Sequence, residues 1–148
     1  MAANSIREQI LLAVLDAVRP SVEALGATLH RSPTVAISRE QCPALVVFSE
    51  SESITERAND RVTRVLVVRL VALARAVPPA TPETEADRLL TAAHAALLAK
   101  RNLGDLALGI QEQECEWDIE DADAVAAAIP ARYAITYRTL DTDLSTKG

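Results

Sequence analysis

The hydrophobic pattern of the chain centres on residues 61–76, RVTRVLVVRLVALARA, which we interpret as one long β-strand. Its middle, residues 65–68, is apolar on both faces and rich in β-branched valine, as is typical of a strand inside a sheet between two covering layers. Fully extended at ~3.3 Å per residue, it would span about 50 Å, which exceeds the width of a small domain. We therefore expect one end to leave the core as an arm. A helix remains the alternative, because Leu, Ala and Arg also favour helices.

An amphipathic helix is predicted ahead of this strand, from about Ile6 to Leu25. Ser5 and Glu8 form a capping box at its start, and apolar residues then recur every three or four positions. Pro20 falls inside the pattern and is expected to kink or end the helix. Gly26 provides a stop signal.

Two short strands are predicted between the helix and the long strand, at 35–37 after a proline and at 44–48 after another. The polar segment 49–60 follows. It is either a mobile connection or the solvated tip of an extended hairpin, and in the second case it can serve as a polar arm that contacts neighbouring subunits.

A second helix is predicted from about Pro82 to Lys100 or Arg101, because Thr81 is a good N-cap and a proline at the first helical position is favoured. The alternation in residues 107–119 then predicts a strand. One of its faces would carry four carboxylates in a row, which must be solvated or matched by a partner.

The last part of the chain is predicted to contain an insertion, a strand and a tail. Residues 121–129 suggest a short helix or loop, and residues 132–140 a strand. Arg132 and Arg138 of this strand would face the acidic strand if the two pair antiparallel. Residues 141–148 are polar and are expected to be flexible.

The predicted fold class is α+β, with two helices on one face of a mostly antiparallel sheet in the order α-β-β-β-α-β-β. The 148 residues suit a single domain, with an ordered core at about residues 5–140. An apolar fraction of 49% excludes disorder for most of the chain.

The net charge of −6 argues against sequence-specific nucleic-acid binding and against anionic membrane surfaces, because both need a basic patch. The chain contains no apolar run long enough to cross a membrane and no secretory signal, so we expect neither. Cys42 and Cys115 lie far apart in the sequence and are expected to be reduced and buried.

No motif in the sequence indicates catalysis, a metal site or a cofactor, and we expect none of the three. His30, expected in a loop, and His94, in the second helix, are not at metal-ligand spacing with each other or with a cysteine. The nucleotide-binding and hydrolase glycine motifs are absent. An acidic set can bind a hard cation or form a solvated face, without matching the EF-hand pattern. This set comprises Glu112, Glu114, Glu116, Glu120, Asp121 and Asp123.

The order and texture of the elements resemble the tail terminator family of long-tailed phages, also known as the minor tail protein U family of lambda-like phages. The resemblance covers about residues 5–140. It is carried by the proline-introduced strand CPALVVFSESE, the long strand V-x-x-V-L-V-V-x-L, the strand E-x-E-x-x-W-D and the terminal I-T-Y-R-T. Segments 49–60 and 121–129 depart from the family pattern.

The resemblance implies a virion structural protein that forms a hexameric ring on the tail tube, stops its polymerisation and presents a surface to the head. The implied partners are other copies of the chain, the tail tube protein and a head-completion protein. The implied location is the virion tail, with the host cytoplasm during assembly. No cofactor is implied. The alternatives are another ring-forming head–tail completion protein, another oligomeric interaction module, or a small-molecule enzyme or binding domain.

Two sets of residues are the predicted contact surfaces of such a ring. The predicted interface with a neighbouring subunit or the tube comprises Glu50, Glu52, Glu56, Arg57, Arg61 and Arg64. The predicted acidic lining of the channel, which would let DNA pass without sticking, comprises Glu112, Glu114, Glu116 and Asp118.

Overall fold

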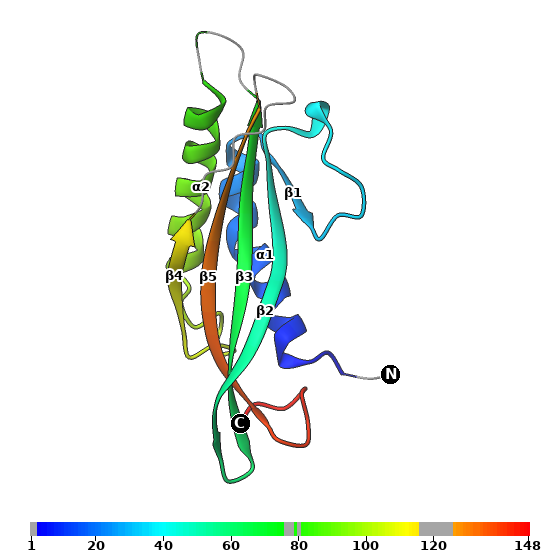
Figure 1. Cartoon of the computed structure of the whole chain (residues 1–148), viewed down its shortest axis with the longest axis vertical. Coiled ribbons are helices and arrows are strands. Elements are labelled where there is room, and N and C mark those ends of the chain that lie inside the picture. Colours follow the sequence, from blue (N-terminus) through cyan, green and yellow to red (C-terminus); the bar gives the residue numbers. More distant parts are fainter. Residues whose placement is uncertain (1–2, 76–78, 80, 116–125) are drawn as a thin grey trace.

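The computed structural model describes residues 3–75, 79, 81–115 and 126–148. Within them, two α-helices and five strands follow one another in the predicted order (Figure 1). The elements are α1 Ile6–Ala24, β1 Thr28–Arg31, β2 Ala44–Ala58, β3 Arg61–Arg75, α2 Pro82–Leu98, β4 Gly109–Cys115 and β5 Ala126–Leu140, with a short 3₁₀ turn, η1, at Arg39–Gln41.

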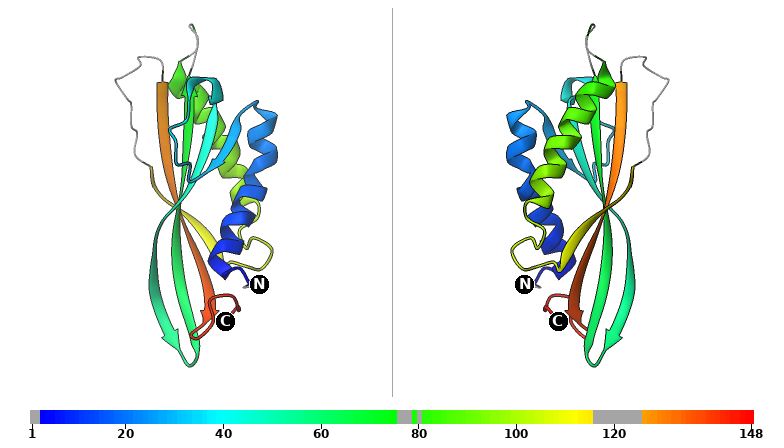
Figure 2. Two further views of the ribbon diagram at one scale, coloured as in Figure 1. Left: turned by 90° about the vertical axis from the view of Figure 1, so that its right-hand side faces the viewer. Right: turned by 90° about the vertical axis from the view of Figure 1, so that its left-hand side faces the viewer.

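The sheet has the strand order β1-β2-β3-β5-β4, so the long strand β3 is central as predicted. β1 pairs parallel with β2, and the remaining neighbours pair antiparallel. Both helices lie on one face of the sheet (Figure 2). The predicted α+β class is confirmed. The expectation of a covering layer on each side of β3 is wrong, because the helices cover only one side; we call the other side the open face.

β2 and β3 form one long hairpin, paired from Ala44 and Leu73 at one end to Ala58 and Arg61 at the other. The polar segment 49–60 is therefore the tip of an extended hairpin and not a loop. The tip projects past the ends of both helices (Figure 2), as expected for an arm. Asn59 adopts a positive φ of 59° in the turn, a conformation that asparagine tolerates better than most residues.

α1 begins as predicted, with the Ser5 hydroxyl oxygen accepting a hydrogen bond from the Glu8 amide at 3.0 Å. The Glu8 carboxylate binds the Arg31 guanidinium through two bonds of 2.6 Å, which ties α1 to β1. The helix continues through Pro20 to Ala24. Val22, beyond the proline, is fully buried, so packing favours continuing the helix.

α2 begins at the predicted cap, where the Thr81 hydroxyl accepts from the Thr84 amide at 3.3 Å. It ends at Leu98, slightly before the predicted Lys100 or Arg101. Its buried residues, among them Leu89, Ala93 and Leu97, face the sheet.

The prediction of a strand at 35–37 is wrong. The strand beside β2 is β1, at 28–31, so His30 lies in a strand and not in a loop. The Thr28 amide bonds to the carbonyl oxygen of Pro43 at 3.0 Å, and this bond places β1 against the start of β2. Residues 35–37 lie outside the helices and strands, beside the open face.

β5 is longer than predicted, because it begins at Ala126. Residues 126–129, predicted as part of a helical or loop insertion, pair with residues 72–75 of β3. Alanine favours helices, and here strand pairing overrides that preference. The described part of the acidic strand is β4, and residues 116–125 lie outside the described residues.

The C-terminal residues 141–148 make backbone contacts with the rest of the chain, and their flexibility stays a prediction. The Leu144 carbonyl accepts from the Ile6 amide at 2.8 Å, at the first residue of α1. Lys147 forms a bridge with Thr139 of β5. The chain end therefore lies against both β5 and the start of α1.

Candidate functional site

Side chains of the two central strands alternate between a buried face and the open face. In β3, Leu66, Val68, Leu70 and Ala72 are buried beneath the helices, as are their partners in β5. The residues between them, Val67, Arg69 and Val71, are half-buried on the open face, as is Leu73 beyond them. The open face is thus an apolar sheet surface without a helical layer.

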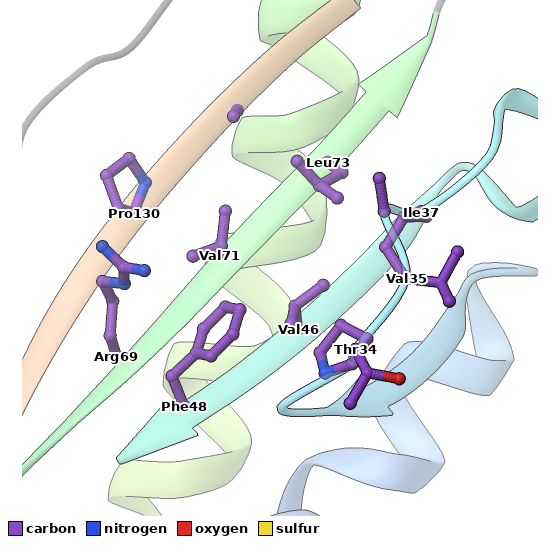
Figure 3. Close-up of a pocket in the computed structure, with 12 residues that line it drawn as sticks. Thr34, Val35, Ile37, Val46, Phe48, Arg69, Val71, Leu73 and Pro130 are labelled. Carbon is purple, nitrogen blue, oxygen red and sulfur yellow. The ribbon is translucent and has the colours of Figure 1, made fainter. Parts of the chain in front are cut away.

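The upper part of the open face forms a groove of about 360 Å³ beneath the segment 33–37 (Figure 3). Val35 of that segment is 77% exposed, although it is apolar. The groove is lined by Pro33, Thr34, Val35, Ala36, Ile37, Val46, Phe48, Arg69, Val71, Leu73, Ala128 and Pro130.

Arg69 lies at one end of this groove, with its guanidinium carbon 5.0 Å from the centre of the Phe48 ring. It lies directly opposite Arg132 in the pairing of β3 with β5, which places two like charges side by side. Its Nε atom is buried and has no hydrogen-bond partner among the described residues. The patterns described under Sequence analysis do not predict a role for Arg69. The available signal was a charged residue inside the apolar run VLVVRLVAL.

The two arginines of β5 do not face the acidic strand. Arg132 binds Glu50 on the open face, with its Nε atom 2.8 Å from a carboxylate oxygen. Arg138 donates to the Thr63 hydroxyl at 3.1 Å, also on the open face. Glu112 of β4 lies on the opposite face, since its neighbour two residues earlier, Ile110, is buried under the helices.

The residues predicted to contact a partner fall into two groups. Glu56, Arg57 and Arg61 are exposed near the hairpin tip; Arg57 lies 3.9 Å from Asp141, and Arg61 3.2 Å from Asp60. Glu50 pairs with Arg132. Glu52 and Arg64 are engaged within the subunit.

Glu52 is the centre of an ion cluster on the helix side of the sheet. Its carboxylate binds the guanidinium groups of Arg7 at 3.2 Å and Arg64 at 3.6 Å, and it accepts a hydrogen bond from the Tyr137 hydroxyl. Only 17% of its side chain and 12% of that of Arg64 are exposed. Arg64 also donates to Thr139 at 3.1 Å.

A β-bulge explains why Glu52 faces the helices. Phe48 and Glu52 are an even number of residues apart, so in a regular strand both would lie on the open face. The pairing with β3 shifts by one residue between Ser49 and Ser51. This shift turns Glu52 to the face of Leu66, its partner in β3.

Burial raises the pKa of Tyr137 to about 12, and the hydrogen bond to Glu52 adds to the increase. The unfolded value is about 10. The fold therefore favours the neutral phenol, and its stabilising contribution is complete below pH ~10 and is lost as the pH rises towards 12. In an absorbance titration of phenolate formation, we expect a transition near pH 12 that is absent in Tyr137→Phe. A transition near pH 10 in the folded protein that this variant removes would contradict the assignment.

β4 and α2 together form an acidic edge, which we define as Asp87, Glu112 and Glu114. Asp87 and Glu112 line a common groove of about 300 Å³, in which the Nδ1 atom of His94 lies 2.8 Å from the Tyr133 hydroxyl and 3.9 Å from the Glu112 carboxylate. Glu114 is exposed. Glu116 and Asp118 lie outside the described residues, and the channel lining stays a prediction.

The described residues contain no group of three or more His, Cys, Asp or Glu side chains placed to hold a metal ion. Cys42 is a free thiol, and burial raises its pKa, so the reactive thiolate is disfavoured. Neither described helix is long and apolar enough to span a membrane.

The sheet leaves two strand edges open. β1 pairs only with residues 44–47 of β2, so residues 48–58 have no neighbour on that side in the described structure. β4 is the opposite edge. Exposed carboxylates lie on both edges, at Glu56 on β2 and at Glu112 and Glu114 on β4, whereas Glu50 and Glu52 are paired with arginines of the same chain. Like charges therefore oppose direct pairing of the two edges in separate copies.

No protein-family model matches the chain, and no curated protein matches it. Its fold is similar to that of a chain in the virion of a native gene transfer agent (GTA) particle. The two structures align with a TM-score of 0.58 over 85% of this chain and 92% of that chain, at 12% sequence identity. At this identity the similarity establishes a shared fold.

Proposed function

We propose that this chain is a structural protein of a virion and that it acts without catalysis. The observation that carries the proposal is the fold shared, over 85% of the chain, with a component of the GTA virion. The size of that component also fits, because the alignment covers 92% of its length.

Within this class, the role that fits best is a tail terminator, which forms a ring on the end of the tail tube, stops its polymerisation and presents a surface to the head. The resemblance of the sequence to the tail terminator family supports this role. The hairpin arm and the open face supply two surfaces for contacts between subunits or with the tube. The exposed residues Glu56, Arg57 and Arg61 are the proposed contacts of the arm.

The test is a tube-polymerisation assay with the tail tube protein of the same particle. Purified chain added during polymerisation should shorten the tubes and leave a density on one end of each in electron micrographs. The matched control is Leu70→Ala, which is expected to weaken the fold, at a temperature where it is unfolded. Tube lengths that do not change would contradict termination.

The same assay separates the second candidate, another ring-forming head–tail completion protein, which has equal support from the shared fold. Such a protein would leave tube length unchanged and would instead bind the head or an already terminated tail. Binding to heads without any effect on tubes would therefore favour this candidate.

A further inference from the structure

We propose that the open face, centred on Arg69, is the surface on which a second copy of this chain docks its acidic edge. The contact is head-to-tail, since it joins two different surfaces of identical subunits, and repeated contacts of this kind close a ring or extend a filament. The inference deepens the proposed function and rests on it only in assuming that copies assemble.

The charges of the two surfaces are complementary. β2, β3 and β5 place five arginines but only two glutamates on the open face, although the net charge of the chain is −6. The arginines are Arg61, Arg69, Arg75, Arg132 and Arg138. The acidic edge carries three carboxylates. Among the described residues, arginines thus outnumber carboxylates on the open face, and the acidic edge of a second copy would supply the complementary charge.

Within the open face, Arg69 is the side chain for which we propose a negatively charged partner from a second copy. None of the ion pairs among the described residues includes it. Its buried Nε donor has no hydrogen-bond partner among the described residues, and a buried donor left without a partner is unfavourable. The guanidinium also lies beside the apolar groove in Figure 3, with the helices behind the sheet. A carboxylate entering from the open side would reach it without crossing the sheet.

The spacing of the two surfaces also agrees. Leu108, which directly precedes β4 next to the acidic edge, is 58% exposed and lies four residues before Glu112; on the open face, Val65 lies four residues before Arg69. Val65 and Arg69 lie roughly 13 Å apart at ~3.3 Å per residue of strand, and Leu108 and Glu112 are separated by the same number of residues along the chain. An apolar contact and an ion pair can therefore form together.

The residues of the two surfaces lie at similar heights along the strand direction. This arrangement suits a ring whose axis runs parallel to the strands. Gly109, next to Leu108, pairs with Thr136, which pairs with Val65. Glu112 pairs with Tyr133, which pairs with Val68, one residue from Arg69. Rotation about such an axis does not change the height of a residue along it. Residues of equal height in neighbouring copies therefore meet, and the acidic edge of one copy lies beside the open face of the next. In this arrangement Glu112 and Glu114 lie in the interface between subunits and not on the wall of the channel.

Sedimentation velocity over a broad concentration series tests the inference on the chain alone. Wild type should self-associate, and Arg69→Glu and Glu112→Lys should each raise the dissociation constant by about 30-fold or more. The matched control is Arg19→Glu, which makes the same charge change on an exposed residue of α1 and should associate like wild type. Thermal unfolding of each variant checks that it is folded.

An equal mixture of Arg69→Glu and Glu112→Lys provides the sharper test. One copy then keeps an intact acidic edge and the other an intact open face, so a head-to-tail contact predicts that the mixture associates where each variant alone does not. Wild type that stays monomeric, Arg69→Glu that behaves like Arg19→Glu, or a mixture without association would each overturn the inference. The tube assay is independent: association through Arg69 with unchanged tubes would reject the proposed function alone.

Discussion

Replacing Leu70 with alanine is expected to lower the free energy of unfolding by about 3 kcal/mol, within the ~2–5 kcal/mol observed for fully buried leucines. Leu70 lies in the middle of the central strand and is completely buried, with Val47 of β2 and Ala131 of β5 as its paired neighbours. Deleting its side chain removes apolar contacts from the core and leaves a cavity that the helices above cannot easily fill. Urea denaturation measures the loss.

Leu73→Ala is the matched control, because it makes the same change in the same strand on the other face. Leu73 is half-buried and lines the open groove, where water or a partner can occupy the space left by its side chain. We expect a loss of about 1 kcal/mol in the isolated chain, in proportion to the smaller apolar area that it buries. Equal losses at the two positions would mean that the open face is packed like the core, and would contradict the open-face assignment.

The parts of the fold that could be predicted are those determined by patterns within a short stretch of sequence. The alternation along residues 61–75 identified the central strand, and the capping residues Ser5 and Thr81 identified the first residues of both helices. These patterns depend on side-chain periodicity and on hydrogen bonds within one turn, so the sequence of a short window contains them.

The errors fall where pairing between distant segments decides the structure. Residues 28–31 carry a weak strand signal, and they become β1 because residues 44–47 offer a free edge. The apolar residues 35–37 instead line the groove on the open face. The alanine-rich residues 126–129 become strand through their pairing with β3. In each case the structure depends on contacts with another segment of the chain, which a local pattern does not contain.

The candidate site was predictable only in part, for the same reason. The sequence places an arginine in the middle of an apolar strand, which marks Arg69 as unusual. Its surroundings, with Phe48 of β2 and Arg132 of β5 as neighbours and no hydrogen-bond partner for Nε among the described residues, follow from strand pairings that no spacing rule predicts. Similarly, the bulge at Ser49–Ser51 brings Glu52 into an ion cluster with Arg7, a contact that the local sequence pattern does not predict.

Replacing Glu52 with alanine is expected to lower the free energy of unfolding by about 2 kcal/mol. The change removes the carboxylate that holds Arg7, Arg64 and the Tyr137 hydroxyl, and it leaves the nearly buried Arg64 guanidinium without its charged partner. Breaking a fully buried ion pair costs about 3–5 kcal/mol. The expected value is smaller, because Arg7 is 38% exposed and water screens part of the interaction. Denaturation in urea, which adds no ionic strength, measures the effect.

Glu56→Ala is the control, since it removes an exposed glutamate from the same strand, four residues nearer the hairpin tip. Its effect on the free energy of unfolding should stay within about 0.5 kcal/mol, as for most surface substitutions. If Glu56 contacts the tube or a neighbouring copy, its loss should instead appear in the tube assay. The two glutamates, equivalent in the sequence pattern, would then separate into a residue that stabilises the base of the arm and a residue that contacts a partner. Equal destabilisation by both variants would contradict that division, because it would require Glu56 to be held within the subunit as tightly as Glu52.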